Sequence, residues 1–346
     1  MGARILVTGG AGYIGAVLVP MLLERGYDVR VLDRLYWGTE PLAPILRDIE
    51  LLEGDVRDLP CGILDGVAAV VHLAGLSNDP TAEFAPLANW KMNAEATESL
   101  ARSCADHGIE RFTFGSSCSV YDSLPAGVVY DEAAALTPRG AYAGSKAQAE
   151  IYLHKATGAG FQPTILRQGT VYGTSPRMRY DLVVNTFVRD AMRLGRLMLH
   201  GGGTMHRPLV DIRDVAEAHI ACLEAPIEQV GGRTFNVLHR NLPIHAVADA
   251  VIREFASRGH TVEVQHAPLP SIVREYQCAN DSLPAATGFT PSRSLEQVLP
   301  ELIAFAEDGH DDFDNKRYYN IDWLTPLRAE IESPVVPRFA GAAGGA

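Results

Sequence analysis

The stretch TGGAGYIG, residues 8–15, decides how the rest of the chain is interpreted. It follows an apolar run at residues 4–7 and leads into an amphipathic helical pattern at residues 14–25. Its glycines at 9, 12 and 15 fit G-x-x-G-x-x-G, and those at 10, 12 and 15 fit G-x-G-x-x-G. Because glycine tolerates positive φ and lets backbone approach a pyrophosphate at a helix N-terminus, this strand–turn–helix pattern predicts a dinucleotide-binding loop.

An acidic residue at the end of the next expected strand, residues 28–32, supports this interpretation. Asp33 stands eighteen positions after Gly15. A carboxylate there accepts hydrogen bonds from the adenosine ribose hydroxyls and repels a 2′-phosphate. The sequence therefore favours NAD over NADP, although the neighbouring Arg34 reduces that preference.

Short apolar runs alternate with helical patterns as far as about residue 175. Further strands are expected at residues 49–53, 68–73, 111–114 and 164–166, with helices at 86–107 and 140–157. Such alternation predicts a Rossmann-type, doubly wound parallel sheet of the α/β class, which forms the first domain, residues 1–175.

The pattern is looser after residue 175, which predicts a smaller C-terminal α/β substrate-binding lobe at residues 176–330, interleaved with the first domain. Helices are expected there at residues 182–194, 215–224, 244–257 and 295–307. The Gly/Ala-rich end, residues 331–346, is expected to be a disordered tail.

Composition limits the function classes. The 346 residues carry 30 Lys and Arg against 42 Asp and Glu, a net charge of −12, which disfavours a nucleic-acid partner. Apolar stretches fall short of the roughly 18 residues of a membrane span, and no signal peptide is recognised, so we expect no membrane partner and a cytoplasmic location. The five cysteines lack CxxC spacing, which indicates reduced thiols and no metal site.

A second motif, YAGSK at residues 142–146, lies in the helical pattern at 140–157. Tyr142 and Lys146 are four residues apart and share one helix face. A nearby ammonium is expected to lower the pKa of the tyrosine from about 10 towards neutrality, which makes the pair an acid/base for a carbinol or carbonyl. The serine-rich run SSCSVY, residues 116–121, follows an expected strand and can supply a hydroxyl to the same substrate oxygen.

Together these motifs resemble the extended short-chain dehydrogenase/reductase family, the family of UDP-galactose 4-epimerase and the nucleotide-sugar dehydratases. The resemblance covers residues 3–310 and includes GDVRD at 54–58, HLAG at 72–75, LRQGTVYG at 166–173 and RPLVDIRDVAEA at 207–218. It implies a catalytic set of Ser117, Tyr142 and Lys146. The residues that it implies for NAD binding are Gly9, Gly12, Tyr13, Ile14, Gly15, Asp33, Arg34, Asp55, Val56, Leu73, Ala74, Gly75, Asn93, Ser116, Tyr142 and Lys146.

For a nucleotide-diphosphate sugar, the resemblance implies a second set of residues. These are Ser117, Ser119, Thr170, Asn185, Arg207 and Arg274. The sequence departs from the family in two places: Cys118 and Ser119 stand where dehydratases carry Asp-Glu, and Gly169 and Thr170 stand where Phe and Asn are usual. The first departure argues against 4,6-dehydration, which needs an acid to protonate the departing hydroxyl. Cys118 is interpreted as a buried small apolar residue.

The resemblance implies an NAD-dependent nucleotide-sugar epimerase that acts at C4 through a 4-keto sugar, with NAD regenerated in each turnover. Two alternatives stay open: an NAD(P)H-dependent nucleotide-sugar 4-ketoreductase and a non-catalytic NAD(P) sensor. We also expect a homodimer. The family's dimer seam maps onto the helices at 86–107 and 140–157, where Leu87, Leu100, Ala147 and Ile151 supply apolar side chains.

Overall fold

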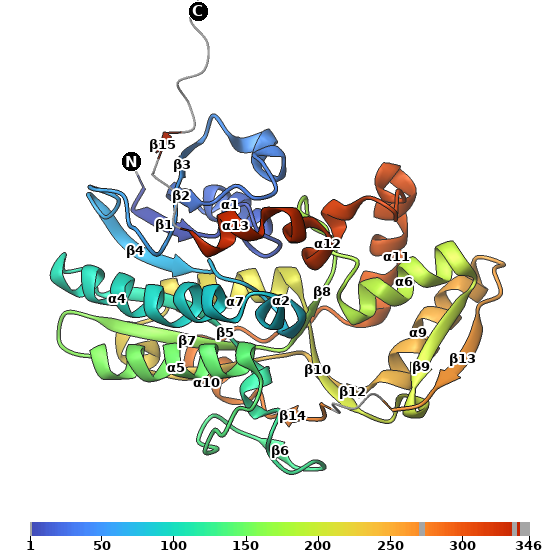
Figure 1. Ribbon diagram of the computed structural model, residues 1–346. Helices are drawn as coiled ribbons and strands as arrows, with labels where there is room; N and C mark the ends of the chain where they lie inside the picture. The colour runs from blue at the N-terminus through green and yellow to red at the C-terminus, as the bar shows by residue number, and fades with distance from the viewer. Residues whose placement is uncertain (1, 270–273, 334–337, 340–346) are drawn as a thin grey trace, which may run out of the picture.

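The structure is a computed structural model that describes residues 2–269, 274–333 and 338–339. Its centre is an eight-stranded sheet, ordered β11-β7-β5-β4-β1-β2-β3-β15 (Figure 1). The strands are β1 (Arg4–Thr8), β2 (Asp28–Asp33), β3 (Ile49–Glu53), β4 (Val67–His72), β5 (Arg111–Ser117), β7 (Gln162–Gln168), β11 (Thr234–Val237) and β15 (Arg338–Phe339). All neighbours are parallel except β15, which runs antiparallel to β3. The doubly wound α/β sheet predicted from the sequence is confirmed.

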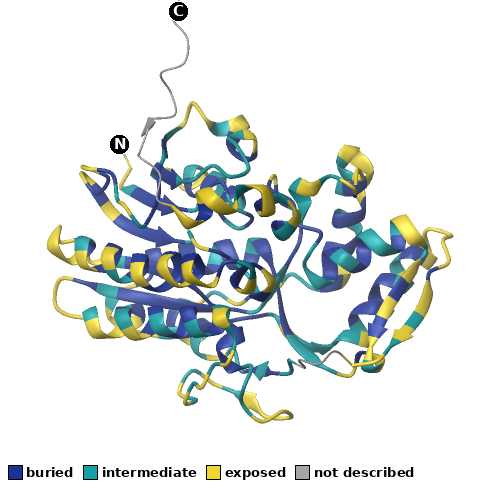
Figure 2. Ribbon diagram, in the orientation of Figure 1, coloured by how far each residue is buried: buried dark blue, intermediate teal, exposed yellow. Residues whose placement is uncertain are grey.

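Helices cover both faces of this sheet and bury its apolar side chains (Figure 2). On one face, α1 (Gly15–Glu24) and α7 (Ile212–Glu224) pack on Ile and Val side chains of β1 and β2. On the other, α4 (Ala96–Asp106) and α5 (Ala141–Ala156) enclose a core that includes Phe112 and Phe114. Because both faces are covered, the strands read as nearly continuous apolar runs.

A smaller lobe follows the sheet and lies at the right of Figure 1. It contains α6 (Val183–Leu194), α9 (Ile244–Ser257) and α11 (Leu295–Phe305), which share one apolar core, and the parallel pair β9 (Arg196–His200) and β13 (Glu263–Ala267). The three-stranded sheet β12-β10-β8 connects this lobe to the main sheet; its strands are β8 (Thr170–Tyr172), β10 (His206–Asp211) and β12 (Arg240–Pro243). A short pair, β6 (Val129–Tyr130) and β14 (Gln277–Cys278), completes the described strands.

The expected helix at residues 86–107 is divided in the structure. It consists of α3 (Pro86–Trp90), a π-helical turn at Lys91–Glu95, and α4. The amide of Asn93 in this turn hydrogen-bonds both the N–H and the C=O of Leu76, at 2.9 Å each. A π turn inserts one extra residue into the helix, and such turns are frequent at functional sites.

The segment from Lys316 to Glu332 runs back over the first strands of the sheet. It contains α12 (Asn320–Leu324) and α13 (Arg328–Glu332), joined by short 3₁₀ turns. The expected tail at 331–346 thus includes five residues of the folded part, because α13 continues through Glu332, the carbonyl of Ser333 accepts hydrogen bonds, and β15 pairs with β3. Residues 334–337 and 340–346 lie outside the described residues.

Candidate functional site

A cavity of about 470 Å³ lies at the carboxyl ends of the parallel strands and is closed on its other side by the smaller lobe. Strand order reverses between β1 and β4, since β2 and β3 extend the sheet one way and β5, β7 and β11 the other. Ligands of doubly wound sheets bind at this kind of switch point. The cavity therefore occupies the place where the fold alone predicts a ligand.

The glycine-rich loop forms one wall of the cavity. Gly9 has φ = +77°, and a Cβ there would lie 2.7 Å from the backbone nitrogen of Ala74. A Cβ on Gly15 would collide with the carbonyl oxygen of Gly9, whereas at Gly12 it would approach that same oxygen only at 3.1 Å. The loop and the start of α1 are thus packed as a cradle that side chains would fill, which suits the diphosphate of a dinucleotide.

Asp33 ends β2 and faces the same cavity. Its carboxylate accepts hydrogen bonds from the backbone N–H groups of Ala11, at 3.0 Å, and Leu35, at 2.8 Å. Burial raises its pKa, and these two hydrogen bonds oppose the rise. The carboxylate is therefore held in place beside the loop, where it can accept ribose hydroxyl groups.

Arg34, the neighbour of Asp33, is bound by residues other than Asp33. It forms an ion pair with Asp55 and donates to the carbonyls of Glu330, at 2.7 Å, and Ser333, at 2.9 Å. Arg57 holds Asp55 from the other side at 2.7 Å and donates to the Ile331 carbonyl at 2.8 Å. Because Arg34 is fixed between Asp55 and the end of α13, it does not offset the preference for NAD that Asp33 sets.

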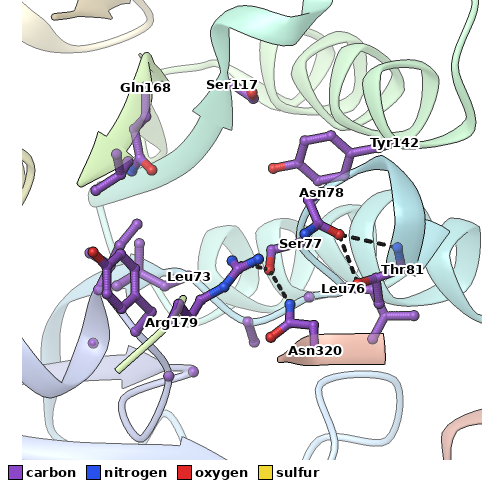
Figure 3. Close-up of a pocket in the computed structure, with 18 of the residues that line it drawn as sticks. Leu73, Leu76, Ser77, Asn78, Thr81, Ser117, Tyr142, Gln168, Arg179 and Asn320 are labelled. Atoms are coloured by element: carbon purple, nitrogen blue, oxygen red, sulfur yellow. Dashed lines mark hydrogen bonds between the residues drawn. The ribbon is translucent and has the colours of Figure 1, made fainter. Parts of the chain in front are cut away.

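Two buried arginines that the sequence motifs did not indicate also line the cavity. Arg177 stacks on the ring of Trp37 at 3.8 Å and donates one hydrogen bond, to Asn320, while its Nε and Nη1 atoms have no partner among the described residues. Arg179 makes a two-pronged pair with Asp181 and a further hydrogen bond to Ser77 (Figure 3). Unpaired guanidinium nitrogens in a buried cavity suit an anionic group such as a diphosphate.

Tyr142, in the first turn of α5, points into the cavity towards Asn78 (Figure 3). The nearby Ser117 hydroxyl and the backbone of Asn78 both lower the pKa of its phenol. Burial, followed by the charge of Asp79, outweighs them and raises the pKa of Tyr142 to about 12. The lowering towards neutrality that we expected from Lys146 is therefore wrong for the protein alone.

Asn78 owes its position to a strained backbone. Its φ of 71° and ψ of 161° lie outside the regions that non-glycine residues favour. Its side chain caps α2 (Asp79–Phe84) by accepting the Thr81 N–H at 3.1 Å. Such strain is concentrated at functional sites, and here it occurs at a residue that lines the cavity beside Tyr142 (Figure 3).

Lys146 lies one turn along α5 but does not line the cavity. Its Nζ donates to the carbonyl of Gly115 at 2.8 Å and stands 6.0 Å from the centre of the Tyr142 ring. Burial lowers its pKa to about 8. The structure thus places the lysine behind the tyrosine, against the end of β5.

The serine-rich turn presents two hydroxyls and no acid. Ser117 accepts the backbone N–H of Ser119 at 3.1 Å, and the hydroxyl of Ser119 has no partner among the described residues. Cys118 is 1% exposed and donates to the Arg167 carbonyl, and burial raises the pKa of its thiol well above its usual value. The interpretation of Cys118 as a buried apolar residue is confirmed.

The expected diphosphate-binding residues are separated by the structure. Arg207 lines the cavity, lies over the ring of Tyr276 at 5.4 Å, and makes both its hydrogen bonds through Nη1. Arg274 lines it too but is paired with Asp79 at 2.8 Å. Asn185 is fully buried behind the wall, where its amide bonds Tyr13, Gly173 and Arg179, so it positions other residues and does not face the cavity.

Most of the expected site residues do border this one cavity. They are Gly9, Gly12, Tyr13, Ile14, Gly15, Asp33, Arg34, Asp55, Val56, Leu73, Ala74, Gly75, Ser116, Ser117, Ser119, Tyr142, Thr170, Arg207 and Arg274. Asn93, like Lys146 and Asn185, stands behind the wall and braces it through Leu76 and Ser145.

Among the described residues, no cluster of His, Cys, Asp or Glu could hold a metal ion, and no helix has the length and apolarity needed to cross a bilayer.

A dinucleotide cradle joined to a half-buried tyrosine and serine and a buried lysine defines a nicotinamide-dependent enzyme of the short-chain dehydrogenase/reductase type. The NAD dependent epimerase/dehydratase family matches residues 5–237, and the chain belongs to that family. NAD is accordingly its cofactor, and the cradle, Asp33 and the unpaired nitrogens of Arg177 fit it.

Similar proteins catalyse several reactions on nucleotide sugars. The chain is 26% identical to a dTDP-glucose 4,6-dehydratase of Streptomyces niveus, over 98% of this chain and 99% of that protein. It is 28% identical to a UDP-N-acetyl-alpha-D-glucosaminuronate decarboxylase of Bacillus cytotoxicus, over 90% and 100% respectively. The solved UDP-glucose 4-epimerase of Thermotoga maritima with UDP-glucose is 25% identical, with a TM-score of 0.78 over 88% of this chain and 99% of that one.

Proposed function

We propose that this chain is a nucleotide-sugar epimerase that acts at C4. The observation that carries the proposal is one cavity, which Tyr142 and Ser117 line together with the glycine loop and Arg207. The two positions after Ser117 hold Cys118 and Ser119, so the turn offers no carboxylic acid for the loss of a hydroxyl.

Each of the site residues has a separate role in the proposed reaction. Bound NAD supplies the acceptor and donor of a hydride. Tyr142 takes the proton from the C4 hydroxyl and returns it after the keto sugar has turned, and Ser117 orients the same oxygen. Lys146 is fixed on the Gly115 carbonyl, behind the tyrosine, and braces the end of β5 there.

The substrate must be held by a part that does not react, so that the sugar is free to turn. Arg207 is the best placed cation for a diphosphate, because its Nε and Nη2 atoms make no hydrogen bond within the described residues. A guanidinium fork binds a diphosphate through charge-assisted hydrogen bonds. We therefore propose that Arg207 holds the nucleotide diphosphate.

The test is NMR of UDP-glucose and dTDP-glucose in D₂O with purified enzyme and no added cofactor. We expect the C4 epimer to form with the hydrogen at C4 retained, because the hydride leaves and returns without meeting solvent. Deuterium in the hexose ring or at C6 would indicate deprotonation next to a keto group and would overturn the proposal.

The 4-ketoreductase is the alternative that the same residues permit. It would consume one NAD(P)H for each keto sugar and leave a nucleotide hexose unchanged. Turnover of UDP-glucose or dTDP-glucose without added NAD(P)H therefore separates the two reactions, and the absence of such turnover together with oxidation of NADPH by a 4-keto sugar would favour the reductase.

A further inference from the structure

A carboxylate on the cavity wall has no part in the function proposed above. Asp79 opens α2, is 8% exposed, and borders the cavity. Its Oδ2 forms an ion pair with Arg274 at 2.8 Å, while its Oδ1 has no hydrogen-bond partner among the described residues. A buried carboxylate oxygen without a donor is costly, and a ligand that brings a donor removes that cost.

The carboxylate lies near the reacting end of the cavity. The residue before it, Asn78, lies beside Tyr142 in the cavity wall (Figure 3), and the charge of Asp79 is a principal cause of the raised pKa of the Tyr142 phenol, second only to burial. A group within electrostatic reach of Tyr142 on the cavity wall faces the sugar and not the nucleoside, because Tyr142 must meet a sugar hydroxyl.

Arg274 does not cancel the negative charge here. Its Nε atom is also 3.9 Å from Asp122, whose Oδ1 has no partner among the described residues either. Asp79 and Asp122 therefore share this guanidinium, and Asp79 does not have Arg274 to itself. Burial raises the pKa of both carboxyls, Arg274 opposes the rise in both, and Arg207 and Arg139 act on Asp122 from the other side.

We propose that Asp79 selects the sugar: its free oxygen accepts a hydrogen bond from a hydroxyl of a neutral hexose and disfavours a hexose that carries a carboxylate. A uronate would place a second anion beside this carboxylate, where like charges repel. The inference rests on the proposed function, because it assumes that a nucleotide sugar occupies this cavity.

The test is calorimetric binding of UDP-glucose and UDP-glucuronate to the NAD-loaded enzyme. We expect wild type to bind UDP-glucose at least about tenfold more tightly than UDP-glucuronate. Asp79→Asn keeps the shape of the side chain and removes its charge, so it should reduce this ratio by about tenfold. Glu83→Gln, which changes an exposed carboxylate on the same helix, is the matched control and should leave the ratio unchanged.

The outcomes separate the two proposals. Equal binding of the two sugars by wild type, or an unchanged ratio in Asp79→Asn, would overturn the role of Asp79 and leave the proposed function standing. A shift in the ratio that Glu83→Gln reproduces would also overturn it, because the effect would then be one of net charge. If wild type binds neither UDP sugar nor the corresponding dTDP pair, the proposed function fails and this inference fails with it.

Discussion

Opposing effects of the surrounding residues set the pKa of the Tyr142 phenol. Burial and Asp79 raise its pKa to about 12, while Ser117 and Asn78 hold it lower than burial alone would. Because the base form of a group appears above its pKa, we expect kcat/KM to rise with pH through neutrality. A profile that falls over pH 6–8 would contradict this assignment.

Replacement of Tyr142 by Phe removes the acid/base and keeps the ring. We expect turnover to fall by about 10²–10⁴-fold, the usual contribution of general acid–base catalysis. NAD content and the thermal midpoint should stay close to wild type, because the ring still fills the same space. Near-normal turnover in Tyr142→Phe would remove this residue from the mechanism.

The variant Arg207→Ala tests whether the Arg207 guanidinium binds the diphosphate of the substrate. Charge-assisted hydrogen bonds contribute about 1.5–3 kcal/mol, so KM should rise by about 10–150-fold with a smaller change in kcat. The control is Arg196→Ala, an exposed arginine in the same lobe, which should leave KM unaltered. An equal KM for the free sugar and the nucleotide sugar in wild type would argue that the diphosphate is not bound.

The residues that could be predicted from sequence are those with a local signature. The glycine loop, Asp33, Ser117 and Tyr142 each lie within a short motif whose spacing has a physical reason. Arg177, Arg179 and Asp79 could not be found this way. Their positions in the cavity wall depend on contacts with Trp37, Ser77 and Arg274, which are distant along the chain. The pKa of Tyr142 was also beyond the motif, because spacing cannot tell that Lys146 is turned towards Gly115.

Among the elements, the strands and helices of the first half follow directly from apolar periodicity. The π turn at Lys91–Glu95 does not, because it depends on the contact between Asn93 and the backbone of Leu76. The antiparallel β15 could not be predicted from the sequence either, because a strand of two residues has no periodic pattern.

The segment with α12 and α13 gives a prediction about cofactor retention. Arg57 donates to the carbonyls of Ile331 and Ser333, and Asn320 and Leu324 from the same segment border the cavity. Arg57→Ala should loosen this cover and increase the dissociation rate of NAD by about tenfold, given about 1.5–3 kcal/mol for hydrogen bonds to a charged group. The measurement is NAD remaining after gel filtration, with the exposed Arg47→Ala as control; equal retention in both would show that the segment does not hold the cofactor.

For the whole molecule, exposed apolar residues on α3 and α5 support the expectation of a homodimer. Leu87 is 66% and Ile151 46% exposed, whereas Leu100 and Ala147, also expected at the seam, are buried in the chain's own core. Light scattering at micromolar concentration should give about twice 37.4 kDa, since a twofold dimer is the commonest homo-oligomer. Leu87→Asp should shift it towards the monomer; a monomeric wild type would contradict the expectation.

Two buried histidines make the folded state sensitive to acid. His72 lies between Thr8 and Thr97, His219 lies between Thr113 and Gln168, and burial lowers the pKa of each to about 3. Because an unfolded histidine takes up a proton below about pH 6.5, the free energy of unfolding should fall from there towards pH 3, by about 2 kcal/mol per histidine at pH 5. Urea unfolding at pH 7 and 5 measures this, and in His219→Gln the loss between the two should be smaller by about that amount.

The hydrogen bond between Arg57 and Ser333 joins residues that are 276 positions apart. A ribosome that adds about 5–20 residues per second needs roughly 14–55 s to make that stretch. The glycine loop therefore emerges long before the segment that covers its cavity has been made. During that interval the nascent chain carries the cradle without its cover, so we expect it to retain the dinucleotide only after this segment has folded into place.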